Sequence, residues 1–154
     1  MFSSIVVGTD GSGTAGQAVS QAIALALKLG AALQIVSAFE PPPDQGVGSE
    51  AGPVQDPGWA VGPHDAVLAL LERAQSEALS AGLREVSTFA RQGDAADAII
   101  DVAEEQRADL IVVGNKGMSG ARRFLLGSVP NRVSHHAPCS VLIVRTSYLP
   151  RKNL

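Results

Sequence analysis

Short apolar runs rich in β-branched residues alternate with alanine- and leucine-rich segments along this 154-residue chain, and this alternation limits the possible folds more than any other feature. Strands are expected at residues 5–7, 33–39, 86–91, 110–113 and 141–144. Helices are expected at residues 15–29, 64–81 and 128–136, with a further one after Asp94 as its N-cap. Apolar strands separated by helices are typical of a parallel sheet covered on both faces. The sequence therefore predicts an α/β, Rossmann-like fold with a doubly wound five-stranded parallel sheet.

The length favours one domain that spans residues 1–154. Residues 40–63 interrupt the alternation, because their many prolines and glycines sustain neither a helix nor a central strand. We expect a long variable loop there. It contains the only tryptophan, Trp59, which either pins the loop to the body, touches a partner or lines a ligand pocket. Residues 147–154 are expected to form a polar tail.

Charge and cysteine content favour a cytoplasmic protein. The net charge of −3 gives no reason to expect nucleic acid as a partner. The one cysteine, Cys139, excludes an internal disulfide, and we expect it to pack as a small buried residue. We expect neither a secretory signal after Met1 nor membrane insertion, because no apolar run approaches the ~20 residues that span a bilayer.

The turns after the first and fourth strands are the expected ligand site, because ligands bind beyond the carboxyl ends of such strands where the strand order reverses. Gly114 and Gly117 follow the fourth strand, and Gly127 with Ser128 opens a helix after nine intervening residues. Glycines permit positive φ and close approach of the backbone to a ligand. The first turn of a helix presents unpaired N–H groups and partial positive charge, and the Ser128 hydroxyl adds a donor. Together these features predict an anion site suited to a polyphosphate.

The same four residues carry a resemblance to a known family. Their order is Gly, two residues, Gly, nine residues, Gly, Ser, and with this spacing the chain resembles the universal stress proteins. The resemblance extends over about residues 3–146. It implies a fold similar to that of the adenine nucleotide alpha hydrolases. Because ATP-binding members carry this motif and non-binding members lack it, it also implies a stress-response protein that binds ATP together with Mg²⁺.

The resemblance assigns a role to each matching position. It implies that Gly114, Gly117, Gly127 and Ser128 contact the phosphates and ribose, and that the backbone of Val129 follows in the same turn. Asp10 matches the aspartate that lies beside adenine and ribose. Ala38 matches a position whose backbone reads the adenine edge.

Other nucleotide-binding patterns remain as alternatives. Residues 11–16 match G-x-G-x-x-G after a strand, and Glu40 has the place of a ribose-binding acid, as in a dinucleotide-binding domain. Against this, Asp10 would repel a pyrophosphate, and the motif from Gly114 to Ser128 would be unexplained. The chain has no Gly-Lys pair and hence no P-loop. A cyclic AMP-binding member of the family and a nucleotide-free interaction protein stay open.

The sequence favours a binder or switch over an enzyme, with at most slow ATP hydrolysis. Asp10 is the only acid that can be placed near the phosphates as a base. Lys116, Arg122 and Arg123 either neutralise phosphate charge or face solvent, and none is assigned as an arginine finger. The adjacent His135 and His136 point about 100° apart on a helix, so we expect no metal site there.

A homodimer is expected through the last strand, residues 140–145. This strand is short, apolar and free of proline, and an uncovered edge of that kind invites pairing with another chain. A two-fold axis would pair the same edge of two subunits and close the assembly. The universal stress proteins commonly dimerise in this way, and the alternative is a tail that folds back over the edge.

Overall fold

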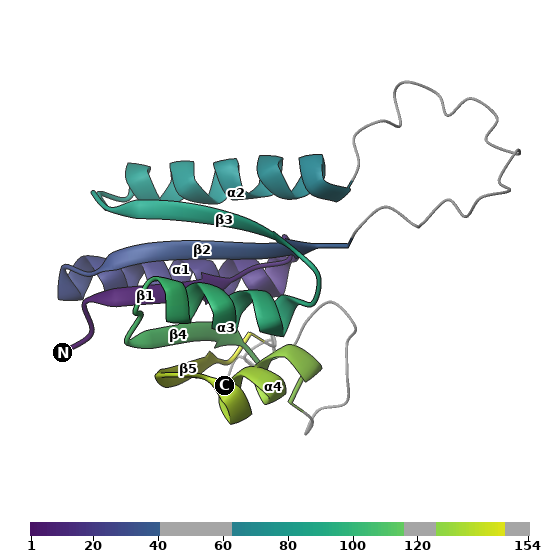
Figure 1. Ribbon diagram of the computed structural model, residues 1–154. Coiled ribbons are helices and arrows are strands. Elements are labelled where there is room, and N and C mark those ends of the chain that lie inside the picture. Colours follow the sequence, from purple (N-terminus) through teal and green to yellow (C-terminus); the bar gives the residue numbers. More distant parts are fainter. Residues whose placement is uncertain (41–62, 116–125, 147–154) are drawn as a thin grey trace, which may run out of the picture.

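The computed structural model describes residues 1–40, 63–115 and 126–146, and these ranges form one parallel sheet covered by helices (Figure 1). The strands are β1 (Ser4–Gly8), β2 (Ala32–Phe39), β3 (Val86–Gln92), β4 (Leu110–Gly114) and β5 (Ser140–Val144). The helices are α1 (Gly13–Leu29), α2 (Pro63–Ser80), α3 (Ala95–Glu105) and α4 (Ser128–His136). All pairings are parallel, in the order β3-β2-β1-β4-β5. This confirms the predicted fold class.

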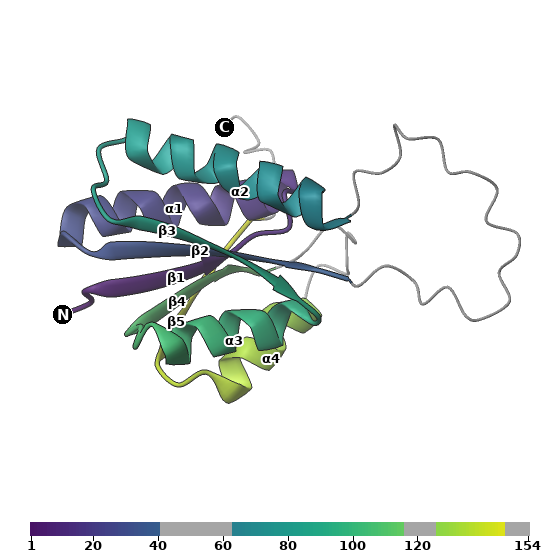
Figure 2. The ribbon, with the colours of Figure 1, turned by 45° about the horizontal axis from the view of Figure 1, so that its top comes forward.

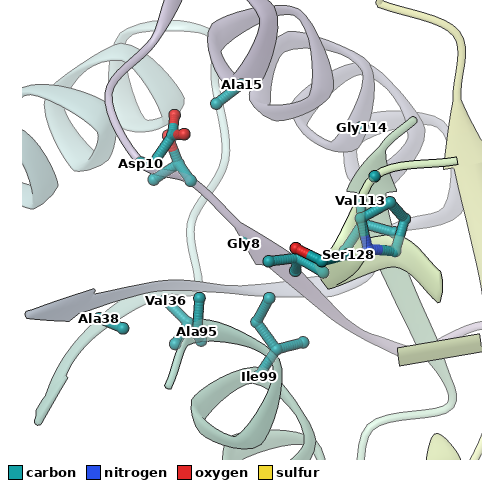
Figure 3. A pocket seen from close by; sticks show the side chains of 14 residues that line it. Gly8, Asp10, Ala15, Val36, Ala38, Ala95, Ile99, Val113, Gly114 and Ser128 are labelled. Atoms are coloured by element: carbon teal, nitrogen blue, oxygen red, sulfur yellow. The ribbon is translucent and has the colours of Figure 1, made fainter. Parts of the chain in front are cut away.

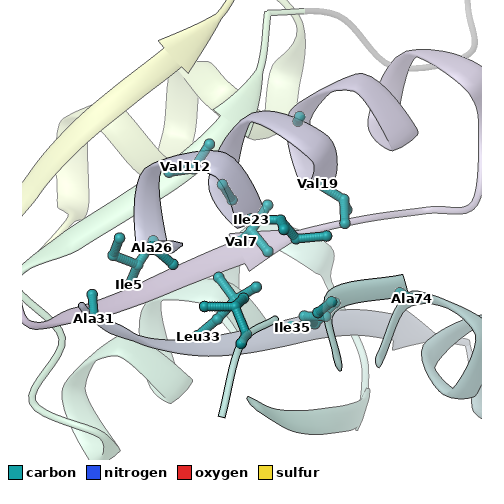
Figure 4. Packing of buried hydrophobic residues seen from close by; sticks show 14 of the residues in the cluster. Ile5, Val7, Val19, Ile23, Ala26, Ala31, Leu33, Ile35, Ala74 and Val112 are labelled. Atoms are coloured by element: carbon teal, nitrogen blue, oxygen red, sulfur yellow. The ribbon is translucent and has the colours of Figure 1, made fainter. Parts of the chain in front are cut away.

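The two faces of the sheet build two apolar layers, because successive strand residues point to opposite sides. Ile5 and Val7 of β1 belong to the apolar layer under α1 and α2, which includes Ile23 and Ala74 (Figure 4). The intervening Val6 points to the other face, which α3 and α4 cover. Figure 2 shows the two helix pairs on opposite sides of the sheet. No helix within the described ranges is long and apolar enough to cross a membrane.

The ends of the helices follow from local capping. Ser12 caps α1 by accepting a hydrogen bond from Ala15 N at 3.1 Å, which starts this helix two residues before the predicted position. Gly30 ends it in the left-handed region with φ 64°. Asp94 caps α3 as predicted and accepts from Asp97 N at 3.0 Å. Trp59, most of the predicted loop and the predicted tail lie outside the described residues.

The strand order reverses at β1, which pairs with β2 on one side and β4 on the other. The chain moves outward from β1 through β2 to β3, then returns to place β4 and β5 on the opposite side. The helices that begin after β1 and β4, α1 and α4, cover different faces of the sheet (Figure 2). The carboxyl ends of β1 and β4 therefore lie side by side with diverging helices, as a ligand site in such a sheet requires.

At the opposite end of the sheet, Asp109 ties the start of β4 to the start of β1. Its carboxylate accepts from Ser3 N at 2.9 Å, from Ser4 N at 3.1 Å and from the Ser3 hydroxyl at 3.0 Å. Partial burial works to raise the pKa of Asp109, but the hydrogen bonds from Ser3 and Ser4 together outweigh it and lower the pKa below its usual 3.8. The ionised form is therefore the one that the fold stabilises.

Asp109→Asn should destabilise the protein in a pH-dependent way. Because the folded-state pKa is lowered, the stabilising contribution is present above the unfolded-state value near 3.8 and is lost as pH falls through the folded-state value. Urea unfolding should show a wild-type advantage of about 1 kcal/mol at about pH 7, which shrinks towards about pH 3. Asp101→Asn, at an exposed position in α3, is the control. A difference that stays constant across this range would contradict the assignment.

Candidate functional site

A pocket of about 140 Å³ opens at the carboxyl ends of the central strands, where the strand order reverses. It brings together the ends of three strands and the beginnings of three helices (Figure 3). Its lining consists of Gly8, Thr9, Asp10, Ala15, Val36, Ala38, Ala95, Ile99, Val113, Gly114, Gly127, Ser128, Val129 and Pro130. Among the described residues, the lining is therefore mostly apolar or glycine, and Asp10 is its one charged side chain.

The turn between β1 and α1 is held by its own polar groups. Asp10 Oδ1 accepts from Ser12 N at 2.9 Å, and Thr9 Oγ1 accepts from Gly11 N at 3.2 Å. Thr9 N donates to the carbonyl of Val36 at 2.9 Å, which fastens the turn to β2. Gly11 adopts φ +83°, a conformation that other residues rarely take. The Asp10 carboxylate is thus oriented by the chain next to it.

The start of α4 forms another side of the pocket. Gly127 is the N-cap, and its N–H donates to the carbonyl of Asn115 at 2.9 Å. The next N–H groups, those of Ser128 and Val129, have no acceptor within the helix, and Pro130 has no N–H. The site therefore presents two backbone donors, the Ser128 hydroxyl and the positive end of the helix dipole.

Gly127 corrects one expectation. It has φ −60° and ψ 162°, so positive φ is not what this position requires. Its N-cap backbone is extended, a conformation open to most residues. A glycine here instead leaves the pocket wall without a side chain, which permits close approach of a ligand to the backbone.

An apolar wall faces these polar elements. Figure 3 shows Val36 and Ala38 from β2 beside Ala95 and Ile99 from α3, with Asp10 and Ser128 on different sides of the pocket. Gly8 makes this packing possible, because a Cβ there would meet Ile99 Cδ1. Because Gly8 has no side chain, Ile99 lies against the end of β1 and lines the pocket there.

Six of the seven predicted site residues line this one pocket: Asp10, Ala38, Gly114, Gly127, Ser128 and Val129. The seventh, Gly117, lies outside the described residues, as do Lys116, Arg122 and Arg123. Sequence reasoning missed the apolar lining, above all Val36, Ala95 and Ile99. The only local signal for these three was their apolar character, which the rest of the core shares.

The other sequence candidates lie elsewhere. Gly13 and Gly16 of the G-x-G-x-x-G pattern line a separate groove with Val144 and Arg145, away from the pocket.

Cys139 is partly buried against the core, and burial, with the nearby Asp109 carboxylate, raises the pKa of its thiol. It therefore stays protonated at neutral pH. Within the described ranges, no three His, Cys, Asp or Glu side chains gather into a possible metal site.

Comparisons with known proteins agree over almost the whole chain. Residues 1–145 match the Universal stress protein family. A universal stress protein of Mycobacterium tuberculosis H37Rv is 36% identical over 146 residues, 95% of this chain and 98% of that protein. One from Thermus aquaticus is 36% identical over 149 residues, 94% of this chain and all of that protein. The crystal structure of a universal stress protein in complex with cAMP shares 35% identity and a TM-score of 0.71, covering 95% of this chain and 99% of that one.

Two glycines in and just before the first turns of α1 should respond oppositely to substitution by alanine. Gly11→Ala should lower the free energy of unfolding by about 1–2 kcal/mol, because φ is +83° and the new Cβ would lie 3.2 Å from Leu70 Cδ1. Gly16→Ala, in α1 with open space around the new Cβ, should raise it by about 0.5–1 kcal/mol. Urea denaturation of both variants measures the contrast. Equal effects would mean that the turn before α1 does not need its left-handed residue.

Proposed function

Because this chain belongs to the universal stress protein family, we propose that its pocket binds an adenine nucleotide and that the protein acts as a nucleotide-dependent binder or switch. The observation that carries the proposal is the division of the pocket into an apolar side and a donor-rich side. The Val36, Ala38 and Ile99 wall suits an adenine ring, and the start of α4 suits phosphate.

The position of Asp10 supports this orientation of the nucleotide. Its carboxylate would repel phosphates, and it lies on a different side of the pocket from Ser128 (Figure 3). In that position it serves as a hydrogen-bond acceptor for ribose hydroxyls. The base and sugar thus occupy the space between Asp10 and Ala38, and the phosphates point towards Ser128 and Val129.

The small volume of the pocket supports phosphates at its rim rather than inside it. Pockets that enclose a whole drug-sized ligand measure roughly 300–1,000 Å³, whereas this one measures about 140 Å³. We propose that it takes the base and sugar, and that the phosphates lie at the start of α4. Gly114 and Gly127 provide the close backbone contacts there. Gly117 lies outside the described residues.

ATP is the ligand that the glycine motif favours, and cyclic AMP is the second candidate. The family's ATP-binding members carry the motif that this chain has at Gly114, Gly117, Gly127 and Ser128. Cyclic AMP is favoured by one observation, the 35% identical relative solved in complex with it. Mg²⁺ would accompany ATP and bind mainly to phosphate oxygens, since it takes few protein ligands in such sites. A cytoplasmic location, expected from the lone Cys139, belongs to the same proposal.

Isothermal titration calorimetry with ATP and Mg²⁺, ADP, AMP and cyclic AMP tests the proposal. We expect the wild type to bind at least one of them. Ala38→Leu should weaken that binding about tenfold or more, because the larger side chain occupies part of the space for the base. Ala24→Leu makes the same change at an exposed position of α1 and is the matched control. Absence of binding by the wild type to all four nucleotides would refute the proposal. Equal affinities of the two variants would mean that the base does not bind against Ala38.

We further propose a homodimer in which β5 pairs with its counterpart in a second copy. β5 is the last strand of the sheet beside β4, and its outer edge has no strand partner among the described residues. Leu142 and Ile143, which point to opposite faces, are 42% and 38% exposed. Exposed apolar side chains on both faces of an unpaired edge are the features that a two-fold strand pairing would cover.

Ile143→Lys should convert the dimer to a monomer, because it places charge within the proposed strand pairing. Leu79→Lys is the matched control, since Leu79 is 49% exposed on α2, away from β5. Multi-angle light scattering at tens of micromolar should give a dimer for the wild type and the control. A monomeric wild type would rule out the dimer, and a dimer unchanged by Ile143→Lys and by Leu142→Pro would locate the contact elsewhere.

A further inference from the structure

Asn115 connects three parts of the chain that meet at the pocket. It follows Gly114 at the end of β4, and its N–H donates to the carbonyl of Val144 at the end of β5 at 2.9 Å. Its own carbonyl accepts from Gly127 N at 2.9 Å. One residue therefore links the end of β4, the end of β5 and the N-cap of α4 through its backbone.

The side chain of Asn115 adds a fourth link, to Thr146. Asn115 Oδ1 accepts from Thr146 N at 2.8 Å and from Thr146 Oγ1 at 2.9 Å. Thr146 is fully buried, with 0% of its surface exposed, although it lies beyond the end of β5. Because a buried donor without an acceptor is costly, this oxygen, which is the one acceptor for both Thr146 donors among the described residues, matters for the stability of this region. Thr146 itself is not part of the pocket lining.

These bonds determine where the two glycine positions of the pocket lie. Gly114 and Gly127 both line the pocket, and the Asn115 backbone is covalently joined to one and hydrogen-bonded to the other. If the Asn115 side chain loses its partner, the peptide groups of Asn115 lose an anchor against rotation. The carbonyl that holds Gly127 would then shift, and with it the start of α4.

We propose that Asn115 is a positioning residue that, anchored by Thr146, holds the start of α4 in the geometry that binds the nucleotide phosphates. The inference rests on the proposed nucleotide binding and adds to it a residue outside the pocket on which affinity depends. Coupling of this kind is reciprocal: a phosphate that binds the aligned start of α4 also stabilises the Asn115–Thr146 bonds. The nucleotide therefore steadies the chain just beyond β5.

Two conservative substitutions at Thr146 separate positioning from general stability. Thr146→Val keeps the shape but removes the hydroxyl donor to Asn115, and Thr146→Ser keeps that donor. Ser4→Ala is the control, because it also removes one side-chain hydrogen bond, to Gln34 Oε1 at 3.1 Å, at the opposite end of the sheet. Each protein is titrated calorimetrically with the nucleotide that the wild type binds best, and its unfolding is measured in urea.

We expect the Kd of Thr146→Val to rise about fivefold, the equivalent of one lost hydrogen bond. Thr146→Ser and Ser4→Ala should keep the wild-type Kd, even where the unfolding midpoint of Ser4→Ala falls as far as that of Thr146→Val. Unchanged affinity of Thr146→Val, or an equal loss in Ser4→Ala, would overturn the inference while leaving nucleotide binding intact. Failure of the wild type to bind any nucleotide would instead overturn the proposed function.

Amide hydrogen exchange of the wild type tests the reciprocal effect without any variant. The exchange rate of the Thr146 amide should fall by about fivefold or more when the nucleotide is bound, because its hydrogen bond to Asn115 opens less often. The Ser4 amide, bonded to Asp109 Oδ1 at 3.1 Å at the far end of β1, is the internal reference and should change less. Equal slowing of both amides, or of neither, would contradict the coupling.

Discussion

The pairing of β1 with a strand on each side is the constraint on which the rest of the structure depends. Val7 lies in register with Ile35 of β2 and with Val112 of β4, and the core residues of β1 are fully buried. A strand buried on both faces and hydrogen-bonded along both edges has no freedom to shift. Because α1 and α4 leave the adjacent ends of β1 and β4 towards opposite faces, a hollow forms between them. The strand order thus determines where the pocket lies, and the side chains determine what lines it.

Within this hollow, the hydrogen-bond donors that the described residues supply are neutral. They are the N–H groups of Ser128 and Val129 and the Ser128 hydroxyl, at the positive end of the α4 helix dipole, where we propose that the phosphates bind. The two N–H groups are held by the backbone and need no side-chain ordering, so they lose little conformational entropy when a ligand binds. The carboxylate of Asp10 is held apart from them by its own hydrogen bond to Ser12 N.

The Asn115–Thr146 pair gives the pocket and the edge strand a shared element. The position of β5 beside β4 is maintained by strand pairing and also by the bond from Asn115 N to the Val144 carbonyl. Asn115 thus joins the ends of β4 and β5 to the start of α4. We propose that the protein acts as a switch and dimerises through that edge, and in that case these bonds would connect the ligand with the assembly.

The sequence by itself determined the local features of this protein. Runs such as Ile5–Val7 indicated strands, Asp94 indicated the N-cap of a helix, and the spacing from Gly114 to Ser128 marked the pocket, because each signal depends on residues close together in the chain. Only the tertiary structure decided which apolar residues line the pocket and which polar ones support it. Val36, Ile99 and Thr146 have no local pattern that distinguishes them from other core residues. They reach the site through strand register and helix packing between segments far apart in sequence, and those contacts exist only once the sheet has formed.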